Sequence, residues 1–218
     1  LNDMGKYHSA LKKHRKAVKI YENALGAEHP DTATSYASIG LVLYQKEDYK
    51  GALEEFQKSL HICQKTLGEE HTQTAKVYND IAVVLNKTRD HDRTVQEYQK
   101  ALRIVEKVKG KEHMNTADIY HNIGRVLYEK GDYYAALSEF RKALHIRQTV
   151  LGKEHPHTAQ LYHNIGAVNY MMEDFNGALE EFSKADKVNK LVLGRKHQYT
   201  INTHAWIARI KREMDSRH

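Results

Sequence analysis

The apolar residues of this chain fall into pairs of helical stripes separated by short polar turns. In residues 109–150 the first stripe follows the i, i+3, i+4, i+7 spacing of a helix face at Tyr120, Ile123, Gly124 and Leu127. The second stripe consists of Tyr133, Ala136, Leu137, Phe140, Ala143 and Leu144. Gly131 and Asp132 stand between the stripes, where glycine permits a turn with positive φ and aspartate caps the next helix. The pattern predicts two antiparallel helices.

This double stripe recurs along the whole chain at a fixed interval. The segments that begin at Leu25, Leu67, Lys109 and Leu151 are 42 residues apart and read LGAEHPDTATSYASIG, LGEEHTQTAKVYNDIA, KGKEHMNTADIYHNIG and LGKEHPHTAQLYHNIG. No insertion or deletion interrupts them. The repeats predict a single array made of a half repeat at 1–24, repeats at 25–66, 67–108, 109–150 and 151–192, and a half repeat at 193–218.

Helix pairs of this kind must stack on one another. Two antiparallel helices cannot bury both of their apolar faces alone, so each pair needs the next pair as a partner. Small residues recur at one position of the first helix, where they allow the second helix to approach closely: Gly40, Ala82, Gly124, Gly166 and Ala208. The fold class that we predict is therefore all-α, a superhelical stack of helix pairs.

The order of these residues resembles the tetratricopeptide repeat. The resembling elements are the Gly or Ala of the first helix, the Gly-Asp-Tyr turn, and the Ala, Phe and Ala of the second helix. The longer unit, with its LG-x-E-H-P-x-T-A segment, is similar to the repeats of kinesin light chains. The resemblance covers essentially the whole chain and implies a right-handed superhelical solenoid of antiparallel helix pairs. It also implies a non-enzymatic scaffold or adaptor that binds an extended peptide in a concave groove lined by the first helices.

The first helices also carry the candidate binding residues. The non-core positions on the inner face of these helices differ from repeat to repeat, whereas the core positions do not. The predicted peptide-binding residues are Lys76, Asn79, Asn86, Lys87, His121, Arg125, Tyr128, His163 and Tyr170. Asparagine can donate to and accept from a peptide backbone, arginine can pair with a carboxylate, and tyrosine adds apolar area. The slight excess of basic groups among the groove residues predicts a partly acidic ligand.

Two of these residues, His121 and His163, occupy the same position in neighbouring repeats. An acidic ligand would favour the charged forms of both imidazoles. The sequence therefore predicts binding that strengthens modestly as the pH falls through the range in which histidine titrates.

Other candidate chemistry is better explained by the repeat. Of the fifteen histidines, five share one register 42 residues apart, namely His29, His71, His113, His155 and His197. Packed helix layers hold such residues too far apart to share a metal ion, so we interpret them as helix-start residues. Cys63 aligns with Val105, Arg147 and Asn189, a register too permissive for a nucleophile. Because metalloprotease, phosphate-loop and hydrolase-elbow motifs are missing, we predict no enzymatic activity, no cofactor and no metal site.

The composition narrows the class of partner and the location. The 218 residues are 40% hydrophobic with a mean hydropathy of −0.73, and no apolar run approaches the length of a membrane helix. We therefore predict no membrane partner. The net charge is +6, but 34 basic residues are interleaved with 28 acidic ones, so nucleic acid is only a minor alternative partner. A single cysteine fits a reducing compartment and predicts a cytoplasmic location.

An alternative function is a structural array that assembles through its ends or edges while the groove stays idle. Residues 5–24 match a second helix without its first, and residues 197–213 match a first helix without its second. One end could complete the other in a heterologous contact between copies, which need not close. His14 and Lys211 stand at core positions and make the two end helices more polar, as terminal repeats require. We expect a monomer with weak head-to-tail self-association.

Overall fold

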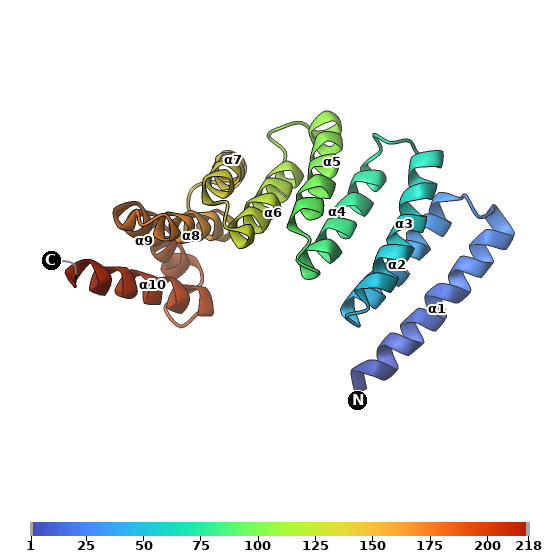
Figure 1. Ribbon diagram of the computed structural model, residues 1–218, viewed down its shortest axis with the longest axis horizontal. Coiled ribbons are helices and arrows are strands. Elements are labelled where there is room, and N and C mark those ends of the chain that lie inside the picture. The colour runs from blue at the N-terminus through green and yellow to red at the C-terminus, as the bar shows by residue number, and fades with distance from the viewer. Residues whose placement is uncertain (1, 217–218) are drawn as a thin grey trace. The chain divides into compact units, whose positions relative to one another are not determined.

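The computed structural model describes residues 2–216, and the side chains of residues 6–216. Its helices are α1 (Asn2–Leu25), α2 (Pro30–Gln45), α3 (Tyr49–Thr66), α4 (Thr72–Lys87), α5 (His91–Lys109), α6 (Met114–Lys130), α7 (Tyr133–Leu151), α8 (Pro156–Met171), α9 (Phe175–Val192) and α10 (Gln198–Asp215) (Figure 1). Residues 2–216 contain no strand, which confirms the all-α fold class. Leu1, where the predicted first half repeat begins, lies outside the described residues.

The helix boundaries follow the predicted period. The first helices of successive helix pairs begin at Pro30, Thr72, Met114, Pro156 and Gln198, each 42 residues after the one before. The second helices begin at the same interval, at Tyr49, His91, Tyr133 and Phe175. One repeat is therefore one helix pair, and α1 corresponds to a second helix while α10 corresponds to a first helix.

The helices form two compact units, residues 1–111 and residues 112–218. In the N-terminal unit, α2 packs on α3 and α4 packs on α5 within the repeats, while α1 meets α2 and α3 meets α4 between them. In the C-terminal unit, the same order holds for α6 with α7, α8 with α9, α7 with α8, and α9 with α10. Within each unit the extensive helix contacts join neighbours in sequence, which is the packing of a solenoid of antiparallel helix pairs.

The two helices of a pair meet at a glycine and a phenylalanine. A Cβ added at Gly124 would lie 2.7 Å from the ring of Phe140, and one added at Gly166 would lie 3.1 Å from the ring of Phe182. Both phenylalanines are almost completely buried. The small residues predicted at this register therefore do allow the close approach, since a larger side chain would have to displace a buried ring.

The five histidines in register start the first helices. In each of them, Nδ1 accepts a hydrogen bond from the backbone N–H two residues later, at 3.0 Å for His113 with Asn115 and 3.1 Å for His71 with Gln73. The others behave in the same way, at His29, His155 and His197. The imidazole thus replaces the usual Ser or Asp as N-cap, and the interpretation of these residues as helix-start residues is confirmed.

In three of the repeats, an aromatic contact joins the two helices near the turn between them. The repeat at 67–108 lacks this contact. That contact pairs Tyr44 with Tyr49 at 5.9 Å between ring centroids, Tyr128 with Tyr133 at 5.7 Å, and Tyr170 with Phe175 at 5.7 Å. In the repeat at 67–108 these positions hold Asn86 and His91. Asn86 Oδ1 and His91 Nδ1 are buried and have no hydrogen-bond partner among the described residues. This repeat therefore lacks an aromatic contact and contains two unsatisfied polar atoms.

Restoring the aromatic pair should stabilise the protein. We expect Asn86→Tyr with His91→Tyr to raise the free energy of unfolding by about 1–3 kcal/mol, because two unsatisfied polar atoms are removed and a ring contact is added. Urea unfolding followed by circular dichroism measures the change. The matched control is Tyr128→Asn with Tyr133→His, which should destabilise by a similar amount. Equal stability of the first variant and the wild type would show that the missing aromatic contact does not destabilise this repeat.

Candidate functional site

Three adjoining hollows lie along the first helices of the C-terminal unit. A hollow of about 240 Å³ is lined by Arg125, Tyr128, Glu129, Phe140, Asn164 and Ala167. A pocket of about 410 Å³ is lined by Pro156, His157, Gln160, His163, Asn164, Asn189, Leu193, His197, Tyr199, Asn202 and Thr203. A third hollow of about 310 Å³ is lined by His163, Asn202, Ala205, Trp206 and Arg209. Asn164 belongs to the first two, and His163 and Asn202 belong to the last two, so the hollows form one surface, here called the α6–α8–α10 groove.

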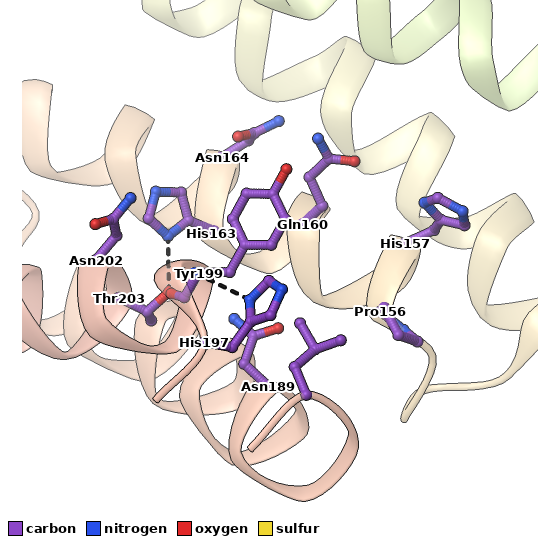
Figure 2. Close-up of a pocket in the computed structure, with 11 residues that line it drawn as sticks. Pro156, His157, Gln160, His163, Asn164, Asn189, His197, Tyr199, Asn202 and Thr203 are labelled. Carbon is purple, nitrogen blue, oxygen red and sulfur yellow. Dashed lines mark hydrogen bonds between the residues drawn. The ribbon is translucent and has the colours of Figure 1, made fainter. Parts of the chain in front are cut away.

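The largest of the three, here called the α8–α10 pocket, opens between the N-terminal halves of two helices. Figure 2 shows side chains from α8 and α10 facing one another across it, with Asn189 contributed by α9. Pro156 opens α8 at a position where proline is pre-organised for a helix, and His197 caps α10. These helix starts fix which residues of the first turns face the pocket.

His163 is held in one tautomer at the centre of the groove. Its Nδ1 lies 3.1 Å from Thr203 Oγ1, and the Thr203 hydroxyl donates its single hydrogen to the backbone oxygen of Tyr199 at 2.8 Å. The hydroxyl therefore accepts from Nδ1–H, which leaves Nε2 as an acceptor in the neutral imidazole. The ring also packs edge-on against Phe182, 5.0 Å between centroids, and burial lowers the pKa of His163.

His121 lies beneath the groove surface instead of on it. It is only 7% exposed, and its Nε2 accepts a hydrogen bond of 2.8 Å from the Asn164 side-chain amide of the next repeat. Burial, with smaller effects from the cations of Arg147 and Arg125, lowers the pKa of His121 to about 3. The residue thus positions Asn164, which lines two of the hollows. The predicted strengthening of ligand binding at low pH loses its basis at His121, because its buried imidazole is neutral where histidine normally titrates. Burial also lowers the pKa of His163, which opposes the predicted effect there.

The other predicted residues of this unit lie along the groove. Arg125 and Tyr128 line the first hollow; Arg125 is exposed, 3.7 Å from Glu129, and Tyr128 packs on Tyr133. The Tyr170 hydroxyl donates to the Glu213 carboxylate at 2.9 Å.

The third hollow is built around an aromatic cluster. The Arg209 guanidinium lies over the rings of Tyr170 and Trp206, 5.1 and 5.3 Å from their centroids, and Trp206 stacks on Phe182 at 5.6 Å. Tyr170 therefore supports the hollow through Arg209 and Trp206, which line it.

The remaining four predicted residues belong to the N-terminal unit. Lys76 is exposed and Asn79 half-buried, and both favour the charged form of Asp80, whose pKa burial raises to about 6. Asn86 is half-buried and Lys87 is exposed. These residues lie on α4, and the other five lie on α6 and α8.

Asn164, Asn189 and Trp206 are among the groove residues that the sequence analysis does not single out. Asn164 belongs to the repeated Tyr-His-Asn-Ile-Gly segment, Asn189 stands at a permissive register, and Trp206 shares the register of Asn164. The signal for Asn189 was available, because it replaces Arg147 at the same register.

Residues 2–216 contain no group of three or more histidine, cysteine, aspartate or glutamate side chains placed to hold a metal ion. Over the same range, none of the helices has the length and apolar character required to cross a bilayer.

The lowered pKa of His121 predicts a stability that depends on pH. The neutral imidazole contributes fully above pH 6.5, and its contribution is lost as the pH falls from 6.5 toward the folded-state pKa of about 3. In the variant His121→Asn, asparagine stands as it does at Asn79 of the preceding repeat. We expect the difference in free energy of unfolding between wild type and this variant to shrink by about 2 kcal/mol from pH 7 to pH 5, because each pH unit below 6.5 costs the wild type about 1.4 kcal/mol. Denaturant unfolding at both pH values measures the gap. His61→Asn, at an exposed site, is the control, and a gap that does not vary with pH would count against the assignment.

Comparisons with known proteins agree with this architecture. No curated protein sequence matches the chain significantly. Among solved structures, BtubC (BKLC) from P. vanneervenii has a TM-score of 0.80 at 24% identity, over 88% of this chain and 77% of that one. A putative kinesin light chain from Podosopora anserina with nearly identical TPR-like repeats has a TM-score of 0.75 at 19% identity, over 86% and 89%. YrrB, described as a TPR protein with an unusual peptide-binding site, has 0.60 at 21% identity, over 94% and 87%. At these identities the likeness concerns the fold alone.

The sequence itself supports the assignment to a family. The family model of the tetratricopeptide repeat matches residues 1–65, 37–93, 73–148 and 117–190, which together span most of the chain. No catalytic family is indicated. The repeating helix pairs and the family match lead to the same conclusion: the chain belongs to the tetratricopeptide-repeat family.

Proposed function

We propose that the α6–α8–α10 groove binds an extended peptide segment of a partner protein. The observation that carries this proposal is the joining of three hollows by shared residues along the first helices. The polar side chains there are specific to each repeat, whereas the glycine and phenylalanine contacts beneath them recur. A tetratricopeptide fold supports a protein–protein interaction scaffold, and a long polar groove with apolar hollows suits an extended peptide.

The proposal extends to the kind of scaffold. The 42-residue spacing of helix starts and the likeness to a putative kinesin light chain favour a kinesin-light-chain-like adaptor. The single cysteine, Cys63, is buried and unpaired, which favours a reducing, cytoplasmic environment.

A partly acidic ligand is proposed on the strength of Arg125. Its guanidinium is exposed on the wall of the first hollow, and Glu129 is loosely placed at 3.7 Å, so a ligand carboxylate can replace this exposed contact.

Peptides selected by display against the whole chain would test this function. For selected peptides that contain a carboxylate, we expect Arg125→Ala to weaken binding by about 1–3 kcal/mol, measured by fluorescence anisotropy. Arg141→Ala is the matched control, because Arg141 is exposed on α7 and lines none of the three hollows. Failure to select any peptide, or equal binding by the two variants, would refute a groove-based function.

A second candidate function is assembly between copies of the chain. Ile20 of α1 is 53% exposed and Ile201 of α10 is 49% exposed, whereas their register counterparts Ile62 and Ala159 are buried. Contact between α10 of one copy and α1 of another would cover both isoleucines in a heterologous interface. Sedimentation velocity at rising protein concentration should show weak association. Ile20→Lys and Ile201→Lys should each abolish this association, whereas the control variant Val108→Lys should retain it. A strictly monomeric chain at high concentration rules this candidate out.

A further inference from the structure

In the preceding repeat, the position equivalent to the α8–α10 pocket is filled by a buried arginine side chain. Arg147 of α7 is 4% exposed, and its side chain spans from α7 to both neighbouring first helices. One guanidinium nitrogen donates to Asp118 Oδ1 of α6 at 2.9 Å, and the other donates to the backbone oxygen of His157 of α8 at 2.8 Å. The guanidinium is thus paired with a carboxylate and a carbonyl, as a buried cation requires.

Forty-two residues later, the same three positions line the pocket. Asn189 replaces Arg147, Gln160 replaces Asp118, and Tyr199 replaces His157 (Figure 2). Thr203 also replaces the fully buried Leu161, which removes further bulk. The pocket is therefore the space that the longer arginine side chain occupies in the preceding repeat.

The position of the Asn189 carboxamide on the pocket wall is a second observation that points to a ligand. Asn189 is 5% exposed and lines the pocket, so what its side-chain amide can still reach is the pocket space. The hydrogen-bond partners of a carboxamide on a pocket wall come from whatever fills the pocket, either water or a ligand. Ligand atoms in the pocket would supply those partners.

The charges around the pocket select the class of ligand. The carboxylate that balances Arg147 has become the neutral Gln160, and no Asp or Glu lines the pocket. A buried guanidinium would therefore lack its counter-charge, and a buried carboxylate would likewise meet no Lys or Arg there. A carboxamide keeps the planar shape and the N–H donors of a guanidinium but carries no charge, and it adds a carbonyl acceptor.

We propose that the α8–α10 pocket binds the side-chain carboxamide of a glutamine in the partner peptide. One of its N–H groups donates to Gln160 Oε1, in the place of the Arg147 guanidinium, and its carbonyl accepts from the Asn189 amide. The inference rests on the proposed function of the groove, since the glutamine belongs to the peptide that lies along it.

The experiment uses N-acetylglutamine methylamide as the probe, titrated into the whole ¹⁵N-labelled chain and followed by NMR. We expect the NMR signals of the Asn189 and Gln160 side-chain amides to shift. The isosteric probe N-acetylglutamate methylamide and the cationic probe N-acetylarginine methylamide should each bind about tenfold more weakly. Stronger binding of the arginine probe, equal binding of all three, or no binding of the glutamine probe would overturn the proposal.

Two variants test the pocket by filling it in one repeat and opening it in the preceding repeat. Gln160→Asp with Asn189→Arg fills the pocket with the ion pair that Asp118 and Arg147 already form, and should weaken binding of the glutamine probe about tenfold. Asp118→Gln with Arg147→Asn and Leu161→Thr should open an equivalent pocket one repeat earlier and produce a second set of shifts near His121. Circular dichroism establishes that each variant is folded. Undiminished binding by a folded filled variant overturns the proposal even if the opened variant is destabilised.

This test separates the pocket from the proposed function of the groove. The free probe reports on the pocket without any partner peptide, whereas the comparison of Arg125→Ala with Arg141→Ala reports on the groove. Selected peptides that bind through Arg125, together with a glutamine probe that does not bind, would refute the pocket inference alone.

Discussion

The close approach of the two helices in each pair is the constraint on which the rest of this structure depends. A Cβ would lie 2.7 Å from the ring of Phe140 at Gly124 and 3.1 Å from the ring of Phe182 at Gly166, so in these pairs the close approach restricts rotation of the helices about their axes. Once this rotation is fixed, the inner face of every first helix is fixed as well. The groove residues can vary only because the positions beneath them do not.

The join between repeats keeps this geometry in register. Besides the histidine N-caps, buried threonines close the inter-repeat loops: the Thr158 hydroxyl donates to the Gly152 backbone oxygen at 2.8 Å, and Thr74 donates to Gly68 at the same distance. With the same loop at each join, equivalent residues meet equivalent surroundings. A few replacements in register, such as Asn189 for Arg147 and Thr203 for Leu161, can therefore turn a filled position into an open one without disturbing the helices.

The fold was predictable to the level of helix pairs, because a 42-residue period with two helical stripes leaves apolar faces that only neighbouring pairs can cover. The site was only partly predictable. Arg125, Tyr128 and His163 do line the groove, but His121 is covered by Asn164, a residue 43 positions later that the pattern of one helix cannot place. Asn189 was passed over because a permissive register indicates tolerance of substitution and does not reveal a buried amide on a pocket wall.

The groove separates charge from hydrogen bonding, and this separation bears on how it would select a ligand. Its charged groups, Arg125 and Arg209, are exposed and already face Glu129 and Glu213. Salt screens such exposed pairs, so they contribute more to the encounter with a ligand than to its discrimination. The interior offers the His163 imidazole and the Asn164 and Asn189 carboxamides, whose partners would be buried once a peptide is bound. A ligand that left one of them unsatisfied would incur the full desolvation cost, and discrimination between peptides would therefore come mainly from these groups.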